Sequence, residues 1–253
     1  GQKIRAKVGI SFVGLNKARS NLSEMKSWDF QEVKDVAVDQ WNQLLSKARV
    51  TGTEENKKIF YTAMYHSYLQ PVNRTGENPK WVSDEPYYDD YFAIWDTFRA
   101  THPLFTLLTP SVQTDMIRSL IDIYKHDGYM PDARSGNDNG RVQGGTDCDI
   151  LIADAMVKGL KNIDYETALQ SMVKNAEVAP GGDERKEGRG GIADYNALGY
   201  VSTAYERAGS RTFEYANCDF AIATVASALG KHDVAEKYYQ RANNWQNIWN
   251  DGI

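Results

Sequence analysis

The connections between the helix-like stretches of this chain alternate between short and long, and this alternation is its strongest constraint on the fold. Apolar residues recur at helical spacing in eight stretches: 29–48, 53–69, 95–108, 111–124, 147–159, 164–176, 211–229 and 232–249. The short connections lie near Val50, Pro110, Asn162 and Lys231, whereas residues 70–94, 125–146 and 177–210 form three long connectors. Antiparallel helix pairs joined in this way present their long connectors on one face, and connectors of this length are usually functional. We therefore expect a mainly α protein with a site on that face.

Residues 1–20 have a different pattern. Polar and apolar side chains alternate from Lys3 to Phe12, which is the period of a half-buried strand. A single strand is not stable by itself. We interpret it as the last strand of a β domain whose remainder lies outside this chain or pairs elsewhere. The predicted division is a strand and linker over 1–20 and a helical domain over 21–253.

Composition narrows the class of protein. A net charge of −5 without clustered Lys and Arg disfavours a nucleic-acid partner. No window reaches the roughly 18 consecutive apolar residues of a membrane span, and none resembles a signal peptide. The chain begins at Gly1 rather than Met, which indicates processing or a piece of a longer protein. Cys148 and Cys218 form one disulfide or, as we favour, remain two buried thiols.

Aromatic residues are abundant in the long connectors. The chain has 6 Trp and 15 Tyr, and many of them stand beside carboxylates and amides. Such mixtures suit the apolar faces and hydroxyl edges of sugar rings. The alternative is that these rings only pack the connectors onto the helix ends.

The first connector leads into a motif that could bind a sugar. Asp96 and Arg99 are three residues apart, so on a helix they share a face and could pair, next to Trp95. A carboxylate beside a guanidinium keeps its charge and accepts hydroxyl groups in a fixed geometry. Alternatively, Asp96 is only a favourable charge at a helix N-terminus.

The second connector is rich in glycine, carboxylates and amides around Asp138. It superficially resembles a calcium loop but lacks the regular carboxylate spacing and the terminal Glu. It is not a phosphate-binding loop, because no Lys-Ser/Thr follows its glycines. A flexible surface loop is the alternative reading.

The third connector and the helix after it offer oxygen ligands for a hard cation. Glu214, Asn217 and Asp194 are the candidates, although Glu214 could simply be a first-turn charge. The four histidines form no HExxH set, and no GxSxG motif is present. What remains is the inventory of a glycoside hydrolase, in which two carboxylates divide the acid and base roles.

At these same loops the chain resembles the α-mannosidases of glycoside hydrolase family 92. The matching segments are Val8-Gly9-Ile10-Ser11-Phe12-Val13, Ile94-Trp95-Asp96-Thr97-Phe98-Arg99, Gly128-Tyr129-Met130-Pro131, Ile152-Ala153-Asp154-Ala155, Gly188-Arg189-Gly190-Gly191 and Ser210-Arg211-Thr212-Phe213-Glu214-Tyr215. The resemblance implies an incomplete (α/α)6 barrel preceded by one β-strand of a β-sandwich domain. The rest of the enzyme, namely the N-terminal sandwich and four barrel helices beyond Ile253, is then expected outside this chain.

The resemblance also implies a calcium-dependent, inverting exo-α-mannosidase acting on mannose-containing glycans. The family's general acid is usually the Glu of a Gly-Asn-Glu stretch, and here Gly136-Asn137-Asp138 makes Asp138 the candidate. Trp95, Asp96, Arg99 and Gln143 are assigned to substrate binding, and Glu214 and Asp194 to calcium. The general base is expected beyond Ile253.

Two alternatives stay open. Because Asp is one methylene shorter than Glu, the acid in this chain is in doubt, and some relatives that cleave mannose-1-phosphodiesters need none, since phosphate leaves readily. A non-catalytic helical-repeat module that binds a glycan or a protein is the second alternative. The sequons Asn21-Leu22-Ser23 and Asn73-Arg74-Thr75, with the family resemblance, favour a secreted, periplasmic or secretory-pathway protein.

Overall fold

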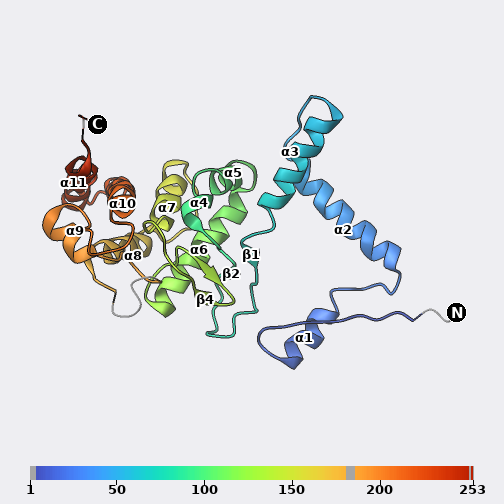
Figure 1. Ribbon diagram of the computed structural model, residues 1–253. Coiled ribbons are helices and arrows are strands. Elements are labelled where there is room, and N and C mark those ends of the chain that lie inside the picture. Colours follow the sequence, from blue (N-terminus) through green and yellow to red (C-terminus); the bar gives the residue numbers. More distant parts are fainter. Residues whose placement is uncertain (1–3, 181–185, 251, 253) are drawn as a thin grey trace.

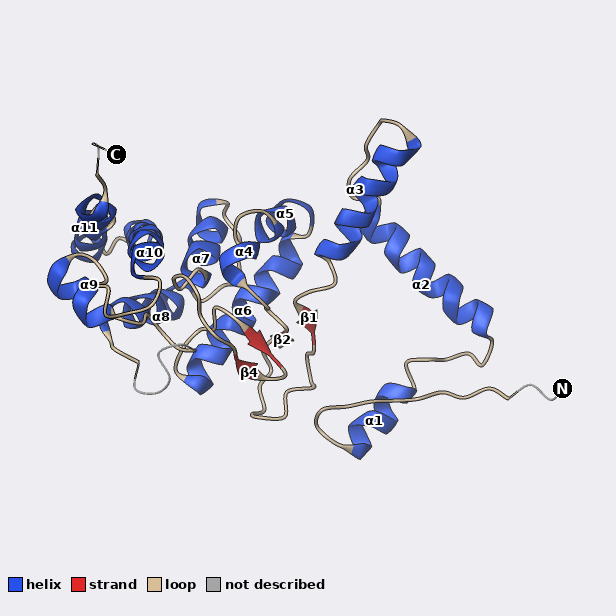
Figure 2. Cartoon of the chain, viewed as in Figure 1, coloured by secondary structure: helices blue, strands red, loops and turns tan. Residues whose placement is uncertain are grey.

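Helices dominate the structure, a computed structural model that describes residues 4–180, 186–250 and 252. Within these ranges the only β structure is two sheets of two strands each (Figure 2). This confirms the prediction of a mainly α chain.

The first three helices form an arm that extends away from the rest of the chain (Figure 1). They are α1 (Leu15–Leu22), α2 (Phe30–Leu45) and α3 (Glu54–Ser67). The side chain of Asp29 caps α2 by accepting a hydrogen bond from the Gln31 amide, and Thr53 caps α3 in the same way. Within residues 4–67, which we call the N-terminal arm, Met64 is the single buried residue.

The predicted strand over Lys3–Phe12 is not formed within the described residues 4–12. This segment is held by side chains instead: Arg5 donates to the Trp28 carbonyl, and the Phe12 amide donates to Glu77. A strand needs a neighbouring strand to take up its backbone hydrogen bonds, and none lies beside this segment in the described part of the chain. The division at residue 20 stays a prediction.

The remaining helices build a compact body. They are α4 (Ile94–Thr97), α5 (Thr101–Leu108), α6 (Pro110–Asp127), α7 (Cys148–Val157), α8 (Tyr165–Glu177), α9 (Ile192–Leu198), α10 (Ala208–Ala228) and α11 (His232–Arg241), followed by a 3₁₀-helix over Asn244–Ile248. Helix α10 packs against α7, α8 and α11, and α6 packs against α5, α7 and α8. Their shared core includes five fully buried side chains: Phe105, Ile117, Leu120, Ile152 and Ile222.

The predicted alternation of connections is present. Helices α5 and α6, α7 and α8, and α10 and α11 are joined by short turns, whereas long connectors join one pair to the next. Local sequence explains several ends. Pro110 begins α6, where its missing N–H is not needed, and Gly128 ends α6 with φ 87°.

The helix predicted over 95–108 is broken into α4 and α5. Pro103 is the reason, because inside a continuous helix its ring would clash with the carbonyl four residues earlier, at Arg99. Restarting at Thr101 places Pro103 in a first turn, where it is tolerated. Ala100, with φ −142°, makes the break.

Two small hairpins shape the first two connectors. Strand β1 (Val72–Asn73) pairs antiparallel with β2 (Tyr88–Asp89), and β3 (Arg134–Ser135) pairs antiparallel with β4 (Asp138–Asn139). Gly136 and Asn137 turn the second hairpin, and both have the positive φ that a tight two-residue turn requires. Cys148 and Cys218 are both free and buried, as predicted.

Candidate active site

The first and second long connectors meet at Asp132. Its backbone carbonyl accepts a hydrogen bond from the Ile94 amide at 2.9 Å, where the first connector ends. Its Oδ1 accepts one from the Asp147 amide at 3.0 Å, where the second connector ends. A single buried residue therefore fixes the starts of α4 and α7 relative to each other.

Glu214 lies close to Trp95 and Arg99 across this junction, although it follows Arg99 by 115 residues in the sequence. Arg99 Nη2 donates to Glu214 Oε1 at 3.1 Å. Gly144 lies between the others: a Cβ built on it would be 3.4 Å from Glu214 Cγ and 3.9 Å from Trp95 Cβ. Two residues assigned to substrate binding, Trp95 and Arg99, therefore lie near Glu214, which is assigned to calcium, and these roles stay predictions.

This cluster is open to solvent on one side. The side chain of Glu214 is 23% exposed, Trp95 is half-buried, and Asp96, Arg99 and Gln143 are exposed. Asp96 follows Trp95 in α4, and Gln143 precedes Gly144, so the chain holds both next to the cluster. The cluster therefore combines a half-buried tryptophan with charged and amide side chains, the residue types that a hexose-binding site uses.

Buried carboxyl groups lie beneath the cluster, and the sequence pattern did not single them out. Asp132 and Asp147 are 1% and 0% exposed, and each has an Oδ2 with no hydrogen-bond partner. Burial, followed by repulsion from Glu214 and then Asp149, raises the pKa of Asp147 to about 7. Burial, followed by repulsion from Asp147, raises the pKa of Asp132 well above its usual range. Because a carboxyl group with a raised pKa stays protonated to higher pH, Asp132 and Asp147 carry less negative charge than ordinary aspartates would.

The third connector joins the site through Arg189. Its guanidinium is fully buried and donates to Asp219 Oδ1 at 2.6 Å, Asp149 Oδ2 at 3.3 Å and Thr146 Oγ1 at 3.2 Å. Arg189 therefore ties the end of the second connector to α7 and to α10, the helix that carries Glu214. The sequence signals for this role were an arginine within a glycine-rich stretch and the match of Gly188-Arg189-Gly190-Gly191 to the family.

Asp138 lies on the hairpin of β3 and β4, away from these contacts. Its carboxylate pairs with Lys80, and its side chain is 73% exposed. The Lys80 hydrogen bond lowers the pKa of Asp138, which is opposite to what a general acid requires. No contact among the described residues joins Asp138 to Trp95, Arg99 or Glu214, so its predicted role as the acid stays a prediction.

The predicted calcium ligands are only partly brought together. Asp194 stands in the first turn of α9, and no described contact links it to Glu214. Asn217 is exposed one turn after Glu214 on α10 and therefore shares its face. Across the described ranges, no three His, Cys, Asp or Glu side chains are placed to hold a metal ion. A calcium ion here would need amide oxygens as well as carboxylates.

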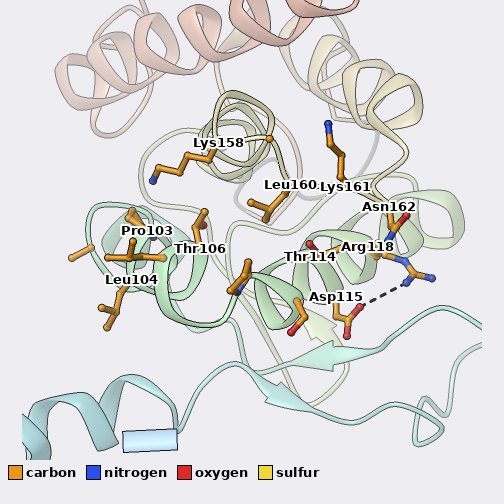
Figure 3. A pocket seen from close by; sticks show the side chains of 15 residues that line it. Pro103, Leu104, Thr106, Thr114, Asp115, Arg118, Lys158, Leu160, Lys161 and Asn162 are labelled. Atoms are coloured by element: carbon orange, nitrogen blue, oxygen red, sulfur yellow. Dashed lines mark ion pairs between the residues drawn. The ribbon is translucent and has the colours of Figure 1, made fainter. Parts of the chain in front are cut away.

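A cavity of about 1060 Å³ lies elsewhere, between α5, α6 and the turn after α7 (Figure 3). Apolar side chains such as Leu104, Leu107 and Leu160 line it, and its acid, Asp115, pairs with Arg118. It adjoins the short turns at Pro110 and Asn162 rather than the long connectors. Unlike the cluster at Glu214, its lining has no aromatic residue among the described side chains.

Comparison with known proteins identifies relatives over nearly the whole chain. Residues 17–253 match the glycosyl hydrolase family 92 catalytic domain. An uncharacterized secreted glycosidase of Arthroderma benhamiae is 33% identical over 98% of this chain and 30% of its own length.

Solved structures agree with this match. An inverting family 92 mannosidase of Bacteroides thetaiotaomicron superposes with a TM-score of 0.86 at 34% identity, over 95% of this chain and 34% of that one. A second family 92 α-mannosidase of that bacterium gives 0.85 at 27% identity, over 95% of this chain and 33% of that one, and it has also been solved with mannoimidazole. The chain thus spans about a third of the length of these relatives.

Proposed function

The chain belongs to glycosyl hydrolase family 92, and on that premise we propose that the full protein removes terminal α-linked mannose from glycans by an inverting, calcium-dependent reaction. Two of its structural relatives are described as mannosidases, one of them as inverting. The likeness to a complex with mannoimidazole supports a mannose-type substrate.

The observation that carries the proposal is the Arg99–Glu214 ion pair, with Gly144 lying between Glu214 and the Cβ of Trp95. The apolar face of a hexose packs on an indole, and its hydroxyl groups bind the paired carboxylate and guanidinium. Because each charge is compensated by the other, the pair holds its geometry before substrate arrives. Asp96 and Gln143 would complete the set of polar contacts around the sugar.

Glu214 is chemically suited to calcium, which prefers oxygen ligands. Its side chain is partly exposed. Asn217 is exposed one turn later on α10, and Gln143 is exposed next to Gly144, which lies against Glu214. Calcium bound here would supply a positive centre for hydroxyl oxygens of the sugar. Arg99, already paired with Glu214, would keep that carboxylate oriented. Asp194 remains a proposed ligand on the strength of the sequence alone.

A second candidate function has one observation in its favour. The pKa of Asp138 is lowered by its hydrogen bond to Lys80, so this carboxyl is a poor proton donor at neutral pH. A mannose-1-phosphodiester would not need the donor, because phosphate is a good leaving group. We therefore carry mannose-1-phosphodiester hydrolysis as the alternative activity of the same site.

We also propose that the protein acts outside the cytoplasm. The support is the name of the Arthroderma relative, a secreted glycosidase, and the suitability of extracellular glycans as substrates. No helix in the described residues is long and apolar enough to span a bilayer.

The decisive experiment is hydrolysis of an aryl α-mannoside by the full-length protein, with and without a chelator. Turnover that the chelator abolishes and added calcium restores supports the proposal. If the full-length protein binds a glycan or a protein but does not hydrolyse the aryl α-mannoside, the chain is part of a binding module instead. Comparing mannobiose with a mannose-1-phosphodiester separates the two enzymatic candidates.

A further inference from the structure

Arg211 is the buried arginine whose charge has no partner. Three arginines in the described part of the chain are 2% exposed or less: Arg134, Arg189 and Arg211. Arg189 is paired with two aspartates, and Arg134 with Asp127. In contrast, Nε and Nη1 of Arg211 are buried without any hydrogen bond, and no described carboxylate lies within the 4.0 Å of an ion pair.

The guanidinium of Arg211 packs against the backbone of Gly190. A Cβ at Gly190 would be 2.7 Å from its Nη1, 3.0 Å from its Cζ and 3.1 Å from its Nη2, so a side chain there would displace the guanidinium. The Tyr215 hydroxyl donates to the Gly190 carbonyl at 2.8 Å and holds this segment in place. Arg211 also stands in the first turn of α10, three residues before Glu214, so the two share a face of the helix.

Charges in the surrounding elements do not neutralise Arg211. Asp149 and Asp219 are matched by Arg189 and Arg241. Glu214 is matched by Arg99. One positive charge is therefore left over between α10 and residues 188–191. A buried charged group without a partner is unfavourable, and such an orphan in a native protein normally marks a missing ion, water or ligand.

We propose that Arg211 anchors an oxyanion-binding site between α10 and residues 188–191, which takes a carboxylate or phosphate group. The planar fork of a guanidinium matches these groups with two parallel hydrogen bonds. The oxyanion could come from solution or from a carboxylate elsewhere in the full-length protein. In either case it would complete the donors that the described residues leave open.

The test uses the full-length protein titrated calorimetrically with inorganic phosphate, and separately with acetate, against chloride at equal ionic strength. We expect saturable binding that Arg211→Met weakens about 10- to 100-fold, as the loss of charge-assisted hydrogen bonds implies. Arg211→Lys, which keeps the charge but not the fork, should fall between. Arg207→Met is the matched control, because Arg207 lies one turn earlier and is paired with Glu206; it should bind like the unmodified protein.

Thermal unfolding distinguishes the two sources. If no anion binds but Arg211→Met lowers the Tm and Arg211→Lys partly restores it, the oxyanion is a carboxylate of the protein itself. If no anion binds and Arg211→Met leaves the Tm unchanged or raises it, Arg211 is an unpaired buried charge and the proposal is wrong. Should Arg211→Met fail to fold, the unmodified protein and Arg211→Lys still decide, because neither readout depends on mannosidase activity.

Discussion

Arg99, between α4 and α5, and Glu214 on α10 are 115 residues apart in sequence, yet their side chains meet at 3.1 Å on the open side of the molecule. Beneath them, Asp132 and Asp147 fill the space with buried carboxyl groups. The ion pair therefore links the segment between α4 and α5 to α10, and the properties of the site should depend on it.

Replacing Glu214 with Gln should impair the enzyme without unfolding it. The amide keeps the shape of the side chain but loses the charge that pairs with Arg99. A hydrogen bond to a charged group contributes about 1.5–3 kcal/mol, so kcat/KM for an aryl α-mannoside should fall about 10- to 150-fold. Glu236→Gln, at an exposed position on α11, is the control and should behave like the unmodified protein. Equal activity in both variants would remove Glu214 from the site.

Gly144 and Gly145 should respond differently to alanine. A Cβ at Gly144 meets only ordinary contacts of 3.4–3.9 Å, so the variant should fold normally. Its methyl group would enter the gap between Trp95 and Glu214 and raise KM for the mannoside about tenfold, or ~1.4 kcal/mol.

At Gly145, a Cβ would lie 2.9 Å from Cys218 Sγ and 3.2 Å from Glu214 Cβ. Overpacking of this kind costs about 1–3 kcal/mol, so Gly145→Ala should lower the Tm. Unfolding scans and steady-state kinetics on both variants check the contrast. A lower Tm in Gly144→Ala than in Gly145→Ala would contradict the geometry.

Removing Lys80 should keep Asp138 protonated to higher pH. Since the Lys80 hydrogen bond lowers the pKa of Asp138, Lys80→Met should return that pKa toward its usual value. If Asp138 protonates the leaving group, the alkaline limb of the pH–rate profile for an aryl α-mannoside moves to higher pH. Asp138→Ala should then lose about 10²- to 10⁴-fold in rate. An unchanged profile together with an active Asp138→Ala would exclude Asp138 as the acid.

His102 should make the folded state sensitive to mild acid. Burial lowers the pKa of His102 from 6.5 to about 4, against the opposing effect of its Gln113 hydrogen bond. Below pH 6.5, His102 is protonated in the unfolded chain but stays neutral in the folded chain. The free energy of unfolding therefore falls as the pH drops from about 6.5 to about 4.

The full loss from His102 is about 3 kcal/mol at 1.36 kcal/mol per pKa unit. Unfolding should be compared at pH 7.5 and pH 4.5. His102→Gln, which cannot titrate, should lose less stability over this interval than the unmodified protein. A larger loss in the variant would mean that His102 is not the responsible group.

The helices could be predicted from sequence because their apolar spacing is a local property. The stripe Ile117, Leu120, Ile121 and Tyr124 predicts the buried face of α6 without knowledge of its neighbours. The short helices α1 and α9 escaped prediction because each is too short for a clear apolar stripe. The segment Lys3–Phe12 was misleading, since an alternating pattern shows what a strand would bury but does not supply the strand beside it.

The site was predictable only in part. Trp95, Asp96 and Arg99 lie within five residues of the chain, so their proximity is local. Glu214 was proposed as a cation ligand because it lies near the start of a predicted helix. The positions of Asp132, Asp147 and Arg189 depend on contacts across 15 to 43 residues, which no spacing rule gives. For Asp138 the sequence was less informative. The stretch Gly136-Asn137-Asp138 indicated a general acid, but the ion pair with Lys80 lowers the pKa of Asp138 and so disfavours that role.

The N-terminal arm buries very few side chains, so it should unfold more easily than the rest of the chain. With Met64 as the single buried residue of the arm, little apolar contact holds α1, α2 and α3 to one another or to the body. Segments with so few buried contacts open at low free energy. In this chain, amide hydrogens of α2 and α3 should exchange for deuterium well before those of α6 and α10, and the arm should melt as a separate unit.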